Sequence, residues 1–146
     1  MEYRKFAQGY VLRLDPGEEI AGSLTRLVEE EGVQLASVSA LGAANDVTIG
    51  IFNTVEKQYY SHRYQGDYEI SALVGNVTQK DGEPYLHLHI TIGNPVTGEV
   101  HAGHLSSATI SAAGSAAKAA RFSSRRNSMA SRFSFPPWML GIQAPS

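Results

Sequence analysis

Residues 84–92 read PYLHLHITI, and apolar residues alternate with polar or aromatic ones along the stretch. Successive side chains of an extended strand point to opposite faces, so the alternation predicts a strand with Leu86 and Leu88 on its apolar face. His87 and His89 then stand side by side on the other face. We therefore expect a sheet that covers a core on one side and presents imidazoles on the other.

A second strand pattern follows at residues 99–110, after a short segment rich in Gly, Asn and Pro. The short connection predicts an antiparallel hairpin with the first strand. If the hairpin is centred on Pro95–Val96, His104 lies opposite His87. His101, three residues before His104, then faces the other side of the sheet.

The hairpin therefore brings together the imidazoles of His87, His89 and His104. Neutral imidazoles suit zinc, and a site with three protein ligands leaves a fourth position for water or a small-molecule ligand. The alternative is that His87 and His89 only form the solvent face of an amphipathic strand. The chain contains no Cys, which excludes a thiolate zinc site, a Cys nucleophile and a disulfide framework.

Residues 68–77 predict another strand and contain the second candidate for chemistry. If Tyr68 and Ile70 take one face, Glu69 projects from the other face of a central strand, where an unpaired carboxylate is costly. Glu69 is thus a candidate fourth metal ligand, an acceptor that holds a histidine tautomer, or a general base for metal-bound water. A salt bridge to Arg63 or to a neighbouring subunit is the structural alternative, and the catalytic residues stay unknown.

A helix is predicted over residues 17–31. Asp15 can cap it, Glu18 can complete a capping box, and Gly32 can supply the left-handed residue that ends it. The apolar residues recur at helical spacing and predict one buried stripe, formed by Ile20, Leu24, Leu27 and Val28.

The remaining patterns predict strands separated by turn-rich segments, at residues 9–14, 33–41, 46–52 and 57–60. Residues 33–41 are apolar or small almost throughout, which is typical of a strand covered on both faces. Gly75 and Asn76 indicate a bulge or a close backbone approach. One helix among six or seven strands predicts an α+β fold, with a mainly antiparallel β-sheet and one flanking α-helix.

The chain has 146 residues, which fits one domain, but its composition changes after residue 111. Residues 1–111 contain all 14 acids against seven Lys and Arg, a balance of −7, whereas residues 112–146 contain five Lys and Arg and no acid. We expect a domain at 1–111 and an atypical Ala/Ser/Arg-rich tail at 112–146. Such a basic end favours contact with nucleic acid or an acidic surface, and a merely solvated tail is the alternative.

No stretch of the sequence approaches the 18 apolar residues of a membrane span, and no hydrophobic run of signal-peptide length follows the N-terminus. Together with the absence of Cys, these observations predict a cytoplasmic protein without membrane contact.

Several of these segments, taken in order, closely resemble the PPC ("plants and prokaryotes conserved") domain. The resemblance covers about residues 8–111. The motifs that carry it are GYVLRL at 9–14, GA at 42–43, YEIS at 68–71, GN at 75–76, DG at 81–82 with LHLH at 86–89, and GHL at 103–105.

This resemblance implies an α+β domain that assembles as a homotrimer. It also implies zinc on the histidines of the His-x-His and Gly-His elements, which here are His87, His89 and His104. Plant members of the family couple the domain to AT-hooks, but this chain lacks the Arg-Gly-Arg core of such a hook. The acidic body also argues against wrapping DNA. Family members usually continue into another apolar strand, where this chain has Ala, Ser and Arg.

Three functional hypotheses follow from the sequence. The first is a zinc-binding, trimeric PPC-type protein of undetermined biochemical role, because no phosphate loop, nucleophile motif or organic-cofactor fingerprint defines a reaction. The second is a DNA-binding or transcription-associated module that uses the basic tail. The third is a structural trimer that presents its surface to partner proteins.

Overall fold

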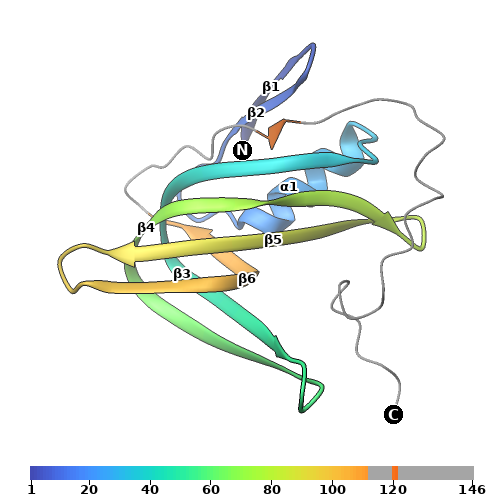
Figure 1. Ribbon diagram of the computed structural model, residues 1–146. Coiled ribbons are helices and arrows are strands. Elements are labelled where there is room, and N and C mark those ends of the chain that lie inside the picture. Colours follow the sequence, from blue (N-terminus) through green and yellow to red (C-terminus); the bar gives the residue numbers. More distant parts are fainter. Residues whose placement is uncertain (112–119, 122–146) are drawn as a thin grey trace.

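The computed structural model describes residues 1–111 and 120–121 (Figure 1). Over these residues it is an α+β structure, mostly antiparallel sheet with a single helix, which confirms the predicted fold class. The elements are β1 (Glu2–Phe6), β2 (Gly9–Arg13), α1 (Ile20–Glu30), β3 (Ala36–Asn53), β4 (Gln58–Lys80), β5 (Glu83–Asn94), β6 (Glu99–Ile110) and β7 (Ala120–Arg121).

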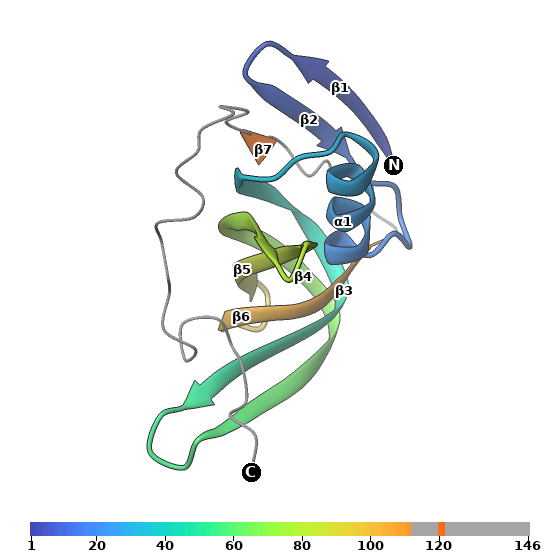
Figure 2. The same cartoon turned by 90° about the vertical axis from the view of Figure 1, so that its right-hand side faces the viewer.

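The strands form one sheet in the order β1-β2-β7-β3-β4-β5-β6, and β6 also pairs with β3. This additional pairing closes β3, β4, β5 and β6 on themselves, so β6 has strand neighbours on both sides. Figure 2 shows α1 lying alongside the sheet, with the β1–β2 hairpin beyond it. The closed strands therefore provide the frame on which the side chains of β5 and β6 are held.

The helix buries the stripe that the sequence predicts, since Ile20, Leu24, Leu27 and Val28 are all buried. Gly32 has a φ of +62°, which confirms it as the left-handed residue after the helix. The stripe packs into a core with apolar residues of the strands, which include Leu12, Val47, Leu73, Ile90, Ile92 and Ile110.

The start of the helix differs from the prediction. Gly17 has a φ of +88°, outside the helical region, so α1 begins at Ile20 and Glu19 is the cap. The Glu19 carboxylate accepts hydrogen bonds from two first-turn amides and from the backbone N–H of Ala108 on β6. Glu18 accepts a hydrogen bond from the backbone N–H of Asp15, as the predicted capping box requires, but this contact lies in the turn before the helix. The helix start is thus tied to the sheet.

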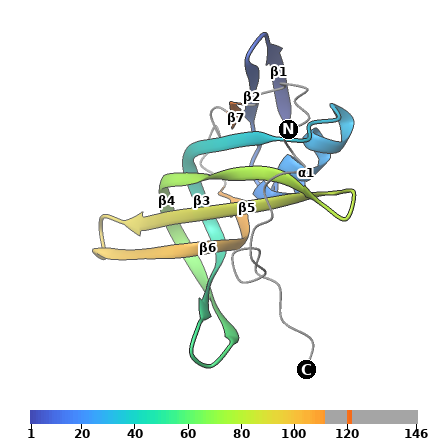
Figure 3. The ribbon, with the colours of Figure 1, turned by 45° about the vertical axis from the view of Figure 1, so that its right-hand side comes forward.

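In two places, a pair of strands predicted as separate forms a single continuous strand. Residues 36–53 form the 18-residue strand β3, and residues 58–80 form the 23-residue strand β4. Register shifts between Ala40 and Gly42 and between Ala44 and Asp46 take the place of the expected turn. Bulges of this kind bend a strand without ending it. The end of the β3–β4 hairpin projects beyond β6, as Figures 1 and 3 show.

The prediction that residues 33–41 are covered on both faces is wrong. Leu35 is 55% exposed and Leu41 is 58% exposed, whereas Ala36 and Val38 between them are buried. Burial therefore alternates along the start of β3, because only one face of the strand packs on the core.

β1 was not predicted from the sequence, and its five residues are mostly polar and exposed. β1 pairs with β2, and polar contacts connect this hairpin to the end of α1. The predicted tail at 112–146 lies outside the described residues, except that β7 pairs with β2 and β3. No helix within the described residues is long and apolar enough to cross a membrane.

Candidate metal centre

The histidines lie on the β5–β6 hairpin, but its register differs from the prediction by two residues. A four-residue turn joins Asn94 to Glu99, and His104 consequently lies opposite His89 rather than His87. A shift by two residues keeps every side chain on its original face, whereas a shift by one would reverse it. The three imidazoles therefore share a face of the sheet despite the wrong register.

The nitrogen atoms of His87, His89 and His104 converge on a small volume. One ligand atom from each residue can be chosen so that all three lie within 4.8 Å of one another. The two Nε2 atoms of His87 and His89 are 3.2 Å apart, close to the ~3.4 Å that separates two tetrahedral ligands of zinc at ~2.0–2.1 Å. The ring centroids are 5.1 to 5.5 Å apart. The donor set and its spacing thus fit a three-histidine metal site.

The environment favours the neutral, metal-binding form of two of these rings. Burial, followed by the charge of His89, lowers the pKa of His87. Burial also lowers the pKa of His104, with smaller contributions from His87 and His89. Because a deprotonated ring nitrogen is the atom that binds a metal, the site is prepared to accept a cation at neutral pH.

A glycine on β4 allows the backbone to approach the histidine strand. A Cβ atom on Gly75 would lie 2.0 Å from the carbonyl oxygen of His87 and 2.8 Å from the Cα of Leu88. These distances confirm the predicted close backbone approach. Asn76 and Val74, on either side of Gly75, pair with His87 and His89 respectively and flank the cluster on β4.

Tyr59, which was not predicted from the sequence, borders the cluster on the other side. Its ring makes an edge contact with the His104 ring at a centroid distance of 6.2 Å, and its hydroxyl lies 3.2 Å from the Ser106 hydroxyl. The Tyr59 ring occupies the space that a side chain at Gly50 would fill. No local motif indicates this contact, because it depends on β4 returning along β3 as far as residue 58.

His101 faces away from the cluster, as the alternation predicts. Its ring stacks on Tyr64 at a centroid distance of 3.8 Å and meets Tyr68 edge-on at 6.0 Å. The exposed ring of His62 contacts this aromatic group through Tyr64. His101 thus has a packing role and stands apart from the three converging rings.

Glu69 does not stand beside the histidines. It is exposed and pairs with Gly93, four residues from His89 along β5, which corresponds to about 13 Å. The group of possible ligands found among the described residues contains the three histidines and no carboxylate. Arg63, the alternative partner of Glu69, forms an ion pair with Asp46 instead. The expected proximity of Glu69 to the site is therefore not observed.

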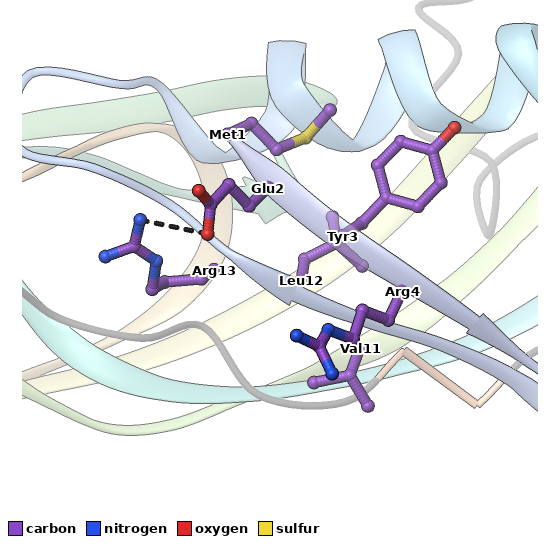
Figure 4. Close-up of a pocket in the computed structure, with 7 residues that line it drawn as sticks. All are labelled: Met1, Glu2, Tyr3, Arg4, Val11, Leu12 and Arg13. Carbon is purple, nitrogen blue, oxygen red and sulfur yellow. Dashed lines mark ion pairs between the residues drawn. The ribbon is translucent and has the colours of Figure 1, made fainter.

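A surface hollow lies elsewhere, on the β1–β2 hairpin (Figure 4). Met1, Tyr3 and Leu12 line it together with the ion pair of Glu2 and Arg13. Its lining contains no histidine, so the three converging histidines lie outside this hollow.

Comparison with known proteins places this geometry in a family. The family model of the Plants and Prokaryotes Conserved (PCC) domain, also abbreviated PPC, matches residues 1–118. A plant- and prokaryote-conserved protein from Pyrococcus horikoshii is 30% identical, with a TM-score of 0.71 over 86% of this chain and 87% of that chain.

Two further solved structures are similar. A proposed DNA-binding protein from Bacteroides thetaiotaomicron is 31% identical, with a TM-score of 0.79 over 86% of this chain and 85% of that chain. A metal-containing protein from Archaeoglobus fulgidus is 33% identical, with a TM-score of 0.71 over 84% of this chain and 86% of that chain.

The chain is also similar to part of a larger curated protein. It is 33% identical over 97 residues to the bifunctional protein GlmU of Synechococcus sp.. The match covers 66% of this chain but only 14% of the length of that relative.

Proposed function

Because this chain belongs to the Plants and Prokaryotes Conserved domain family, we propose that it is a metal-binding protein whose zinc is held by His87, His89 and His104. The observation that carries the proposal is the convergence of three imidazole nitrogens from β5 and β6 within 4.8 Å. The similarity to a metal-containing protein supports it independently.

The chemistry of the donor set favours zinc over harder cations. Mg²⁺ and Ca²⁺ take oxygen ligands, whereas three neutral nitrogens are typical of zinc sites that keep an open position. When bound, such an ion acts as a Lewis acid toward a small ligand at its fourth position. The residues of this chain hold the ion, and Gly75 keeps β4 close behind His87.

The experiment that tests this function is metal analysis of the full-length protein. We expect about one zinc per chain, lost in the variant His104→Ala because two ligands hold the ion far less tightly. The matched control is His101→Ala, on the same strand but on the opposite face, where the ring stacks on Tyr64. Zinc-free protein after incubation with zinc, or equal zinc content in both variants, would contradict the proposal.

Homotrimer formation, which the family resemblance implies, belongs to the same proposal. The projecting end of the β3–β4 hairpin carries exposed apolar side chains, among them Ile51 and Val55. Exposed apolar groups in one place favour an interaction with another protein surface. Light scattering of the full-length protein is expected to give about three times the chain mass, and Ile51→Glu to reduce it. A monomeric mass for the unmodified chain would contradict trimerisation.

DNA binding is the second candidate function. Its support is the similarity to a proposed DNA-binding protein, together with the five Lys and Arg of residues 112–146. Phosphate contacts make such binding salt-dependent. We expect a salt-sensitive mobility shift of duplex DNA that weakens when Arg125 and Arg126 are both changed to Gln. No shift at low salt would leave metal binding or a purely structural trimer as the function.

A further inference from the structure

Beyond the three histidines, a second set of polar groups borders the candidate metal centre. In the row of paired positions across the sheet, Val74 is followed by His89, then His104, then Gly50. Gly50 has no side chain, and the Tyr59 hydroxyl lies 2.0 Å from where its Cβ atom would be. The phenol group of Tyr59 therefore takes the position next to His104, on the same face as the metal-ligating rings.

The hydroxyl groups of Tyr59 and Ser106 bond to each other and leave one O–H donor unused. Two hydroxyl groups carry two protons, and their mutual hydrogen bond at 3.2 Å uses one of them. Neither hydroxyl makes another hydrogen bond to the residues that the structure describes. On the opposite side of the cluster, the exposed Asn76 offers amide N–H donors beside His87.

The nearest acidic side chains along β4 and β5 lie far from the three histidines. Glu83 lies four residues from His87, and Glu69 pairs four residues from His89, each corresponding to about 13 Å. A divalent cation held by these three neutral imidazoles would keep its charge of +2, because the possible ligands among the described residues include no carboxylate. Positive charge bordered by neutral hydrogen-bond donors is the arrangement that attracts an anion.

We propose that the site takes a small oxyanion, such as a carboxylate or phosphate, at the open metal position, and that Tyr59, supported by Ser106, donates the hydrogen bond that positions it. This inference rests on the proposed metal function. Tyr59 acts as a positioning residue and not as a metal ligand. Gly50 is a requirement of the arrangement, since any side chain there would displace the phenol ring.

The test uses full-length protein loaded with Co²⁺ in place of zinc, and visible absorption as the readout. Acetate, phosphate and neutral acetamide are titrated separately, so that the spectra report which ligand reaches the ion. We expect saturable spectral changes with acetate or phosphate and none with acetamide at the same concentration. The tighter of the two anions distinguishes a carboxylate ligand from a phosphate ligand.

The decisive variants are Tyr59→Phe and Ser106→Ala, with Tyr60→Phe as the matched control. Tyr60 is the neighbouring tyrosine, and its hydroxyl bonds to Glu56 and Gln58 instead. Loss of a hydrogen bond to a charged ligand is expected to weaken anion binding about 10-fold in Tyr59→Phe and less in Ser106→Ala, with Co²⁺ uptake unchanged.

The outcomes separate the two proposals. Unmodified protein that takes up no Co²⁺ overturns the metal function and this inference with it. Full Co²⁺ uptake combined with equal anion affinity in the unmodified protein, Tyr59→Phe and Tyr60→Phe overturns the inference alone. A spectral response to acetamide as strong as that to acetate overturns the anion class. If Tyr59→Phe fails to fold, Ser106→Ala decides by the same criteria.

Discussion

Two clusters of polar side chains in this molecule differ in how their charges are balanced. At the end of α1, the Glu31 carboxylate accepts hydrogen bonds from Tyr3, Lys5 and Tyr10, at 3.0, 2.6 and 2.8 Å. On β5 and β6, three imidazoles converge with no carboxylate in the group. The first cluster contains both donors and acceptor, so it joins the β1–β2 hairpin to the helix. The second presents lone pairs that a cation would complete.

The pKa values reflect the same difference. The ammonium group of Lys5, followed by the hydroxyls of Tyr10 and Tyr3, lowers the pKa of Glu31 to about 2. The pKa values of His87 and His104 are lowered mainly by burial, which no nearby acid compensates. Convergence of polar groups therefore indicates a structural contact where charges are complementary, and a ligand site where they are not.

The largest effect that separates the two clusters is expected from zinc itself. Zinc added to metal-free protein should raise the melting temperature, because a ligand that binds only the folded state stabilises it. The increase should persist in Glu31→Gln and vanish in His104→Ala, as differential scanning fluorimetry can measure. An equal zinc response in both variants would remove the distinction between the clusters.

The next largest effect is expected from Gly75→Ala. The new Cβ atom would clash with the His87 carbonyl oxygen, so β4 and β5 must move apart at the histidines. We expect a loss of about 1–3 kcal/mol in the free energy of unfolding, together with weaker zinc binding. Denaturant unfolding and zinc titration measure the two quantities. The control is Gly82→Ala, a turn position with φ of +89° and no neighbour within 4 Å of the added atom, where only stability should fall. Normal zinc affinity in Gly75→Ala would show that the close approach does not shape the site.

A smaller effect is expected from pH at the Glu31 cluster. The folded-state pKa of Glu31 is about 2 and its ordinary value is 4.5, so the carboxylate favours the folded state above pH 4.5. This contribution is lost as pH falls from about 4.5 to about 2. Glu31→Gln should therefore flatten the pH dependence of unfolding in this range. Parallel curves for the variant and the unmodified protein would contradict the pKa assignment.

The smallest effect is expected from Tyr3→Phe, which removes one of the three donors to Glu31 and retains Lys5 and Tyr10. The melting temperature should fall by less than in Glu31→Gln, because two donors still bond the carboxylate. Zinc content should be unchanged, and metal analysis of the same samples checks this. A loss as large as in Glu31→Gln would mean that the Tyr3 hydroxyl, rather than Lys5, supplies most of the stabilisation at Glu31.

The candidate site was predictable because it depends only on which face of the strand each side chain takes, and this face alternates from one residue to the next. The alternation of residues 84–92 assigns His87 and His89 to one face. His104 joins them in every hairpin register that differs from the observed one by an even number of residues. The predicted register was wrong by two residues, yet the prediction that the rings share a face survived. Glu69 was not predictable in the same way. Four residues of β5 separate its partner Gly93 from His89, a distance that local sequence does not encode.

Alternation, turn residues and helical spacing are local properties, so the amino-acid order alone specifies most of the extended segments, the buried stripe of α1 and the face on which the histidines lie. The folded chain decides whether a turn residue ends a strand or becomes a bulge, as at Ala44 and Asp46. It also decides which remote residue borders the site, as Tyr59 does through the gap at Gly50. Such contacts arise from the pairing of distant strands, and their energies depend on neighbours that no short segment contains.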